Sequence, residues 1–181
     1  MKTKYLAAII GSLTVIALLF FLLTFEAKNQ EQMVEKDAIK EVILSVFDGW
    51  NYNEEKSADF EALNAAFADS AILRSFRSGK MDVYYKEAYL EGYKRFEESK
   101  ALKMVFEREI TGEIEVFGRA AQYVGSYEIY YNDLSSPAEK GMNFIQLAKI
   151  EGKWRITSVM WDVETPDRPI PVRFMRKMGQ P

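Results

Sequence analysis

The sequence predicts an α+β fold in which a cone-shaped, strongly curved antiparallel sheet packs on three N-terminal helices, with one transmembrane or signal helix in front of them. Three observations support this prediction. An uncharged apolar run fills residues 6–25, apolar residues recur at helical spacing between about residues 36 and 100, and after Lys100 they alternate with a period of two. Helices followed by a run of strands are typical of an α+β domain.

The apolar run LAAIIGSLTVIALLFFLLTF, residues 6–25, predicts a membrane-spanning anchor. As a helix it would span about 30 Å, the thickness of bilayer hydrocarbon. Lys2 and Lys4 precede it and acidic residues follow it, so we expect residues 1–5 in the cytoplasm and the domain on the extracytoplasmic side. The alternative is a cleaved signal peptide, which would leave a secreted or periplasmic domain. Residues 26–35 are expected to form a linker.

Three helices are expected next. The first has apolar side chains at i, i+3 and i+4 spacing, namely Ile39, Val42, Ile43, Val46, Phe47 and Trp50. The second is short, takes Ser57 as its N-cap, and is followed by a strand of about eight residues from Ser70. The third follows the segment SGKMD and carries an aromatic stripe of Tyr85, Tyr89, Tyr93 and Phe96. Such a stripe is typical of core packing.

Alternating segments after Lys100 predict the strands of an antiparallel meander: LKMVFEREIT, EIEVF, AAQYVGSYEIYY, GMNFIQLAKI and KWRITSVMWDV. Glycines and turn residues separate them. A strongly twisted sheet folded over one long helix leaves a conical cavity between the two. The meander completes a domain of residues 36–164. Residues 165–181 contain four of the five prolines and are expected to form an extended tail.

Composition excludes several classes of function. Of the 24 basic residues, Lys2 and Lys4 precede the apolar run, whereas all 27 acidic residues follow it, which leaves 22 basic against 27 acidic residues and a formal charge of −5. An acidic domain argues against nucleic acid as a partner. The chain has no cysteine and no histidine, so it offers no thiol nucleophile, no imidazole base and no usual zinc or copper ligand. We expect no metal and no cofactor.

Two stretches, ALNAAFADSAIL and GKWRITSVMWDVE, together with the order of elements, resemble the nuclear transport factor 2-like superfamily, which includes SnoaL-like and ketosteroid-isomerase-like proteins. The resemblance covers Lys36 to Glu164. It implies a pocket inside the cone, lined by the first helix, the third helix and the concave face of the sheet. It also implies that the domain forms a homodimer through its sheet. Such signatures specify a fold better than an activity.

The resemblance bears on catalysis mainly through Ser75. In the ketosteroid isomerases that the stretch resembles, the residue matching Ser75, counted from the shared Ala68-Asp69, is the aspartate that moves the substrate proton. An unassisted serine hydroxyl cannot serve as that base. The oxyanion-stabilising tyrosine of those enzymes falls near Phe47, which donates no hydrogen bond. The histidine of scytalone-dehydratase-like members is missing, so no catalytic residue is assigned.

Strand alternation and helical spacing give the candidate pocket residues. Leu73 and Arg77 share the face of Ser75, and Arg77 could pair an anionic ligand or form a salt bridge with a glutamate. Tyr123 and Tyr127 lie on the more apolar face of their strand. Glu107, Glu109, Asp162 and Glu164 form weak acidic clusters, which alternating charges on a solvent face would equally explain. The predicted ligand-binding set is Phe47, Trp50, Leu73, Ser75, Arg77, Tyr85, Tyr123, Tyr127 and Trp161.

These observations predict a membrane-anchored extracytoplasmic domain that binds a small apolar or anionic molecule, or a protein partner, without catalysis. One alternative is a SnoaL-like isomerase, cyclase or hydrolase acting on an apolar substrate, with Tyr127, Arg77 or Asp162 in place of the missing aspartate. The other is a bitopic assembly component of an envelope machine. A closed apolar cone would favour the assembly hypothesis. An open cone with few polar groups would favour ligand binding, and titratable groups that converge in the cone would favour catalysis.

Overall fold

The computed structural model describes residue 26 and residues 30–175. The chain divides into two compact units, Met1–Asp37 and Ala38–Pro181. In the first unit the described residues are helical. A helix covers residues 30–50, and from residue 38 onward it belongs to the second unit. Within the described ranges, no helix has both the length and the apolar character needed to cross a bilayer. The predicted anchor, residues 6–25, lies outside them.

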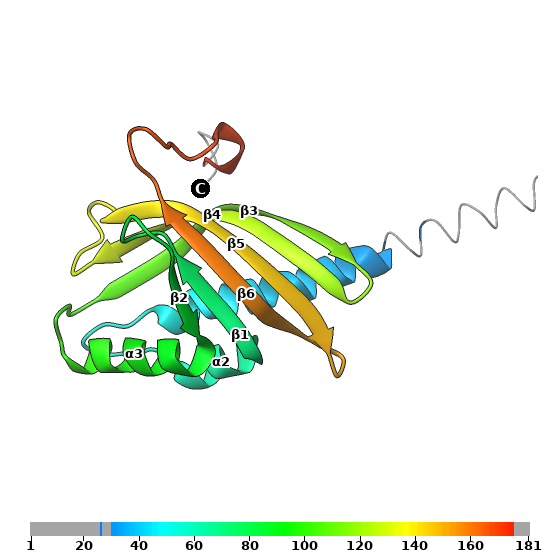
Figure 1. The fold of residues 1–181 in the computed structure, drawn as a ribbon, viewed down its shortest axis with the longest axis horizontal. Helices are drawn as coiled ribbons and strands as arrows, with labels where there is room; N and C mark the ends of the chain where they lie inside the picture. Colours follow the sequence, from blue (N-terminus) through cyan, green and yellow to red (C-terminus); the bar gives the residue numbers. More distant parts are fainter. Residues whose placement is uncertain (1–25, 27–29, 176–181) are drawn as a thin grey trace, which may run out of the picture. The chain divides into compact units, whose positions relative to one another are not determined.

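The second unit is an α+β domain built on one six-stranded sheet with the order β2-β1-β6-β5-β4-β3 (Figure 1). After the helix of residues 30–50 come α2 (Phe60–Ala66), β1 (Phe67–Ser75), β2 (Asp82–Tyr85), α3 (Lys86–Glu98), β3 (Val105–Phe117), β4 (Ala120–Tyr131), β5 (Glu139–Ile150), β6 (Lys153–Val163) and the 3₁₀ turn η1 (Val172–Phe174). β3 to β6 form the expected antiparallel meander. β1 runs parallel to β6, so the prediction of a wholly antiparallel sheet is wrong.

The N-terminal half differs from the prediction at three boundaries. Asp59, not Ser57, is the N-cap of α2, because its carboxylate accepts a hydrogen bond from the backbone N–H of Ala62. β1 begins at Phe67 rather than Ser70, since α2 ends in an extended residue that pairs at once with β6. The short strand β2 was not predicted. It pairs with β1 and leads directly into α3.

Gly112 does not end a strand as predicted. β3 runs through it as one strand, with a register shift between Glu109 and Thr111. A Cβ atom at Gly112 would clash with the Tyr123 ring and lie 2.6 Å from the Glu109 carboxylate. The glycine is therefore needed because Tyr123 packs flat on the strand, and not because the chain turns there.

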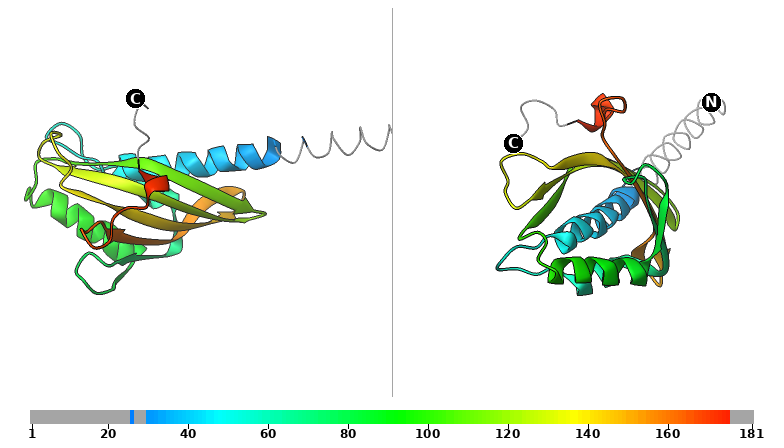
Figure 2. Two further views of the ribbon diagram at one scale, coloured as in Figure 1. Left: turned by 90° about the horizontal axis from the view of Figure 1, so that it is seen from above. Right: turned by 60° about the vertical axis from the view of Figure 1, so that its left-hand side comes forward.

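The main core lies between the concave face of the sheet and the helix. From residue 38 onward the helix runs inside the curve of the sheet, and α3 crosses the open side (Figure 2). The predicted apolar stripe provides the contact, with Ile39, Ile43, Val46, Phe47 and Trp50 all buried. These side chains belong to one core with buried residues of β1, β4, β5 and β6, and Ile114 and Val116 of β3 pack against it. A cavity remains on the side of α3.

The segment after β6 packs on the outer face of the sheet. Its residues Ile170 and Phe174 are buried, with Phe174 only 2% exposed. The hydroxyl of Ser126 donates a 2.5 Å hydrogen bond to the Phe174 carbonyl. Because Tyr127 faces the cavity, its neighbour Ser126 faces the other way. The described part of the tail therefore covers the convex side of β4.

Candidate functional site

In the second unit, a cavity of about 580 Å³ lies between the helix from residue 38 to residue 50, α3 and the concave face of the sheet. Seven of the nine predicted pocket residues border it: Phe47, Trp50, Leu73, Ser75, Arg77, Tyr127 and Trp161. Its wall also includes Tyr84 and Phe96, which are 37% and 39% exposed, and the Arg77 side chain, which is 53% exposed. These partly exposed side chains mark the mouth of the cavity.

Two predicted residues lie outside the cavity. Tyr85 is 66% exposed, because it is the last residue of β2 and alternation turns its neighbour Tyr84 inward instead. Reading Tyr85 as part of a helical stripe therefore shifted the prediction by one residue. Tyr123 is fully buried in the core, where its hydroxyl donates a 2.5 Å hydrogen bond to Glu109.

Aromatic rings form one wall of the cavity. Trp50 packs edge-to-face against Tyr93 and Tyr89, with ring centroids 4.8 and 5.5 Å apart. Tyr89 in turn meets Trp161 at 5.8 Å. The hydroxyl of Tyr93 donates to the backbone carbonyl of Trp50 at 2.7 Å, which ties α3 to the end of the helix. These contacts hold both tryptophans in fixed orientations beside the cavity.

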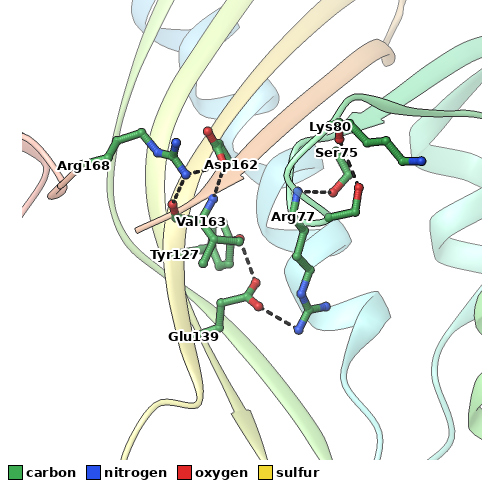
Figure 3. A network of polar contacts seen from close by, with 9 residues as sticks. Ser75, Arg77, Lys80, Tyr127, Glu139, Asp162, Val163 and Arg168 are labelled. Carbon is green, nitrogen blue, oxygen red and sulfur yellow. Dashed lines mark hydrogen bonds and ion pairs between the residues drawn. The ribbon is translucent and has the colours of Figure 1, made fainter. Parts of the chain in front are cut away.

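A polar network at the mouth centres on Glu139 of β5 (Figure 3). Arg77 forms an ion pair with Glu139 at 2.7 Å and donates to the Tyr131 hydroxyl at 2.9 Å. Tyr127 donates to the other Glu139 oxygen at 3.1 Å. Burial alone would lower the pKa of Arg77, but Glu139 and Tyr131 outweigh it and raise that pKa. The sequence left two roles open for Arg77, pairing an anionic ligand or forming a salt bridge with a glutamate. The structure shows the salt bridge with a glutamate.

Ser75 and Asp162 have structural partners. The buried Ser75 hydroxyl accepts the backbone N–H of Arg77 at 3.1 Å, which closes the turn after β1. Asp162 does not border the cavity. Its carboxylate accepts hydrogen bonds from the Val163 backbone and, at 3.2 Å, from Arg168 in the C-terminal segment (Figure 3). The structure therefore gives no support for Asp162 as a cavity base.

Glu107 is the cavity residue that the prediction left out. Together with Glu109 it was attributed to a solvent face, but the register of β3 with Ile129 and Tyr127 turns both side chains to the concave side. Glu109 is paired with Lys40. Glu107 instead borders the cavity, and its backbone is fixed by Asn51, whose side-chain amide accepts from the Glu107 N–H at 2.6 Å and donates to the Glu107 carbonyl at 3.1 Å.

The environment of Glu107 favours its neutral form. Burial raises the pKa of this carboxyl to about 8, the negative charge of Glu139 adds to the effect, and Arg77 opposes it. The side chain remains partly accessible because it borders the cavity. Near neutral pH, Glu107 is therefore mainly a carboxylic acid that can donate as well as accept a hydrogen bond.

Asn143 is a second polar residue that the sequence did not single out. It lies on β5 beside Trp161 of β6, is 8% exposed, and borders the cavity. An asparagine in an alternating strand gives no signal of its own, since its inward position follows only from the register. Among residues 26 and 30–175, no group of three or more acidic side chains is arranged to hold a metal ion.

Comparisons with known proteins support the fold and the family. A family model described as "Putative lumazine-binding" matches residues 34–162. A protein of unknown function with a cystatin-like fold from Nostoc punctiforme has a TM-score of 0.59 at 18% identity, with 74% of this chain and 93% of that chain covered. An NTF-2 like protein of unknown function from Silicibacter pomeroyi has a TM-score of 0.53 at 17% identity, covering 73% and 98%.

A "Putative Scytalone Dehydratase" from Novosphingobium aromaticivorans is similar with a TM-score of 0.60 at 15% identity, covering 84% of this chain and 99% of that chain. A search of curated protein sequences gave no significant match. At these identities the solved structures show the fold alone, and that fold is the nuclear transport factor 2-like fold that the sequence predicted.

Proposed function

This chain belongs to the family described as putative lumazine-binding, and from that premise we propose that its cavity binds a small planar ring compound of the lumazine type without transforming it. The observation that carries the proposal is the aromatic wall of Trp50, Tyr89, Tyr93 and Trp161. A volume of about 580 Å³ is within the usual range for small-molecule sites and suits a ligand of two or three fused rings.

The charges of the cavity argue against an anionic ligand. Arg77 is the cation at the mouth, and its charge is already balanced by Glu139 at 2.7 Å. An anion would have to displace Glu139 and leave that carboxylate unpaired, which is costly in a partly buried site. An uncharged ring that contacts the aromatic wall avoids this cost. The charged and polar lining also differs from the closed apolar cone that the assembly hypothesis requires.

Tryptophan fluorescence provides the test, because the three tryptophans of the chain differ in whether they border the cavity. Trp50 and Trp161 border the cavity, whereas Trp154 lies in the core away from it. Lumazine added to the full-length protein in mild detergent should quench emission in the wild type and in Trp154→Phe. Trp161→Leu should remove part of the quenching and weaken binding about 5–10-fold through the lost stacking. Quenching that disappears only in Trp154→Phe would place the ligand elsewhere.

A second candidate function, proton transfer on the bound ring, is favoured by one observation. Glu107 has a pKa near 8 in a cavity where Arg77 and Glu139 are paired with each other, and a group with that pKa can both take and give a proton near neutral pH. The test is exchange of the acidic C–H of 2-tetralone, a flat bicyclic ketone, in D₂O. Exchange above the buffer rate that Glu107→Gln abolishes would make the protein an enzyme, and exchange at the buffer rate would leave binding alone.

We also propose that residues 6–25 anchor the domain on the extracytoplasmic side of a membrane. The uncharged run and the charges on its two sides support this proposal. The intact protein should stay with membranes through an alkaline wash, and protease added from outside should remove the domain. Recovery of a soluble form that begins near Lys28 would show cleavage instead. Homodimerisation through the sheet also stays a prediction, to be tested by the mass of the detergent-solubilised protein.

A further inference from the structure

Several polar groups border the cavity without a hydrogen-bond or ion-pair partner among the residues that the structure describes. They include the hydroxyls of Tyr84 and Tyr89, the indole N–H groups of Trp50 and Trp161, the carboxyl of Glu107 and the amide of Asn143. The contrast with the rest of the polar lining is clear, since Ser75, Arg77, Tyr93, Tyr127 and Glu139 all have such partners. The polar atoms of Tyr89, Glu107 and Asn143 remain accessible from the cavity, so a ligand there can supply the hydrogen-bond partners that these groups lack within the protein.

The strand registers place Glu107 and Asn143 well apart on the cavity wall. Glu107 of β3 is aligned with Ile129 of β4, whereas Asn143 of β5 is aligned with Gly125 of β4. Four residues of β4 separate the two levels, which is about 13 Å along the strand, and two strand spacings add about 10 Å across it. The two side chains cannot bind the same ligand atom. They can contact opposite edges of one fused ring system.

Charge and hydrogen-bonding capacity narrow the class of ligand. A protonated carboxyl presents an O–H donor beside a C=O acceptor, and an asparagine amide presents an N–H donor beside a C=O acceptor. Both groups are uncharged, and both complement a ring amide, in which an N–H lies next to a C=O. A cation would gain most from an ionised carboxylate without a partner, but Glu139 is paired with Arg77 and Asp82 accepts a hydrogen bond from Ser78. An anion would require a free cation. Tyr89, on α3, is neutral near pH 7 at its ordinary pKa, and burial raises that pKa further.

Resting on the proposed function, we infer that the ligand is an uncharged planar ring compound bearing a ring amide, whose N–H and C=O pair with Glu107 while Asn143 holds a polar atom at the opposite edge. The aromatic wall supplies affinity for any flat ring. Glu107 and Asn143 supply the discrimination among them, because an analogue that cannot pair leaves both groups desolvated without a partner.

The test compares lumazine with 1,3-dimethyllumazine, in which methyl groups block both ring N–H groups, on the full-length protein in detergent at pH 6.5. We expect the dimethyl compound to bind at least about 10-fold more weakly. Glu107→Gln keeps a donor beside an acceptor and should bind lumazine within about threefold of the wild type, whereas Glu107→Leu and Asn143→Leu should each weaken it about 10-fold or more. Glu113→Leu, an exposed position on the same strand, is the matched control.

The remaining outcomes separate this inference from the proposed function. If lumazine and its dimethyl analogue bind equally well and Glu107→Leu changes the affinity for neither compound, the cavity binds flat rings without recognising a ring amide. Only the inference then fails. If the planar cation proflavine binds more tightly than lumazine and Glu107→Gln abolishes its binding, the ligand is a cation and the inference is wrong. If no ring compound binds, the proposed function fails as well. Should Glu107→Leu not fold, the Gln variant and the methylated ligand still decide.

Discussion

Glu107 makes the folded domain sensitive to alkaline pH, and replacing it by glutamine should remove that sensitivity. In the unfolded chain the carboxyl titrates near its ordinary pKa of 4.5, whereas burial raises the value to about 8 in the folded domain. Between these two values the folded state holds a proton that the unfolded state releases. The free energy of unfolding therefore falls as pH rises through this interval, and then stays level above pH 8.

The magnitude follows from the two pKa values. At about 1.4 kcal/mol per pKa unit, the interval from 4.5 to about 8 corresponds to about 5 kcal/mol. Because the carboxyl is partly accessible through the cavity, solvent screens its charge, and we expect about 2–3 kcal/mol. Glu107→Gln carries a neutral side chain of nearly the same shape. It should match the wild type near pH 5 and exceed it by this amount near pH 9.

The assay is urea unfolding of the fragment Glu26–Pro181, followed by tryptophan emission at several pH values. Comparing each variant with the wild type at the same pH cancels the contributions of all other carboxyls. Glu113→Gln removes an exposed carboxyl from the same strand and should show no such trend. A difference between Glu107→Gln and the wild type that stays constant within about 0.5 kcal/mol from pH 5 to pH 9 would refute the raised pKa of Glu107.

Four further substitutions test the packing of the domain by the same unfolding assay. Gly141→Ala would place its Cβ 2.6 Å from the Tyr127 hydroxyl and against the Asp162 backbone, so it should cost about 1–3 kcal/mol, whereas Gly92→Ala on α3 meets nothing within 4 Å and should stabilise by about 0.5–1 kcal/mol. Equal effects of the two would contradict this packing. Phe174→Ala should cost about 3 kcal/mol if the C-terminal segment holds the outer face of β4 as described, and an unchanged unfolding midpoint would show that it does not. Ser75→Ala should cost only about 0.5–1.5 kcal/mol and leave lumazine affinity within twofold, and a larger loss of affinity would give Ser75 a role in binding.

The periodicity of apolar residues was sufficient to predict those features of the fold that depend on one helix or one strand alone. The helical stripe from Ile39 to Trp50 faces the core as predicted, and alternation correctly turned Leu73, Ser75 and Arg77 toward the cavity. The parallel pairing of β1 with β6 could not be found in this way, because it joins segments about 85 residues apart and depends on backbone register rather than on side-chain pattern. β2 was missed because four residues are too few to show alternation.

The site was harder to predict because its polar residues look ordinary in the sequence. Arg77 was recognisable as a candidate, but its partner Glu139 lies on another strand, and only their contact shows that the cation is already neutralised. Glu107 and Asn143 belong to strands with polar residues on both faces. Which face meets the cavity depends on the register with β4 and on the shift between Glu109 and Thr111.

Ser75 and Glu107 together decide what chemistry the cavity can offer. The resemblance to ketosteroid isomerases directed attention to β1, where a carboxylate would act as a base, and there the structure has a serine that accepts a backbone hydrogen bond. The titratable group lies instead on β3, and its pKa near 8 keeps it protonated at neutral pH. A base must be ionised to act, whereas a protonated acid donates a hydrogen bond without transferring its proton. At pH 7 most Glu107 carboxyls are protonated and can donate to a ligand carbonyl, whereas proton abstraction would use only the ionised minority, so the exchange experiment with Glu107→Gln decides between binding and catalysis.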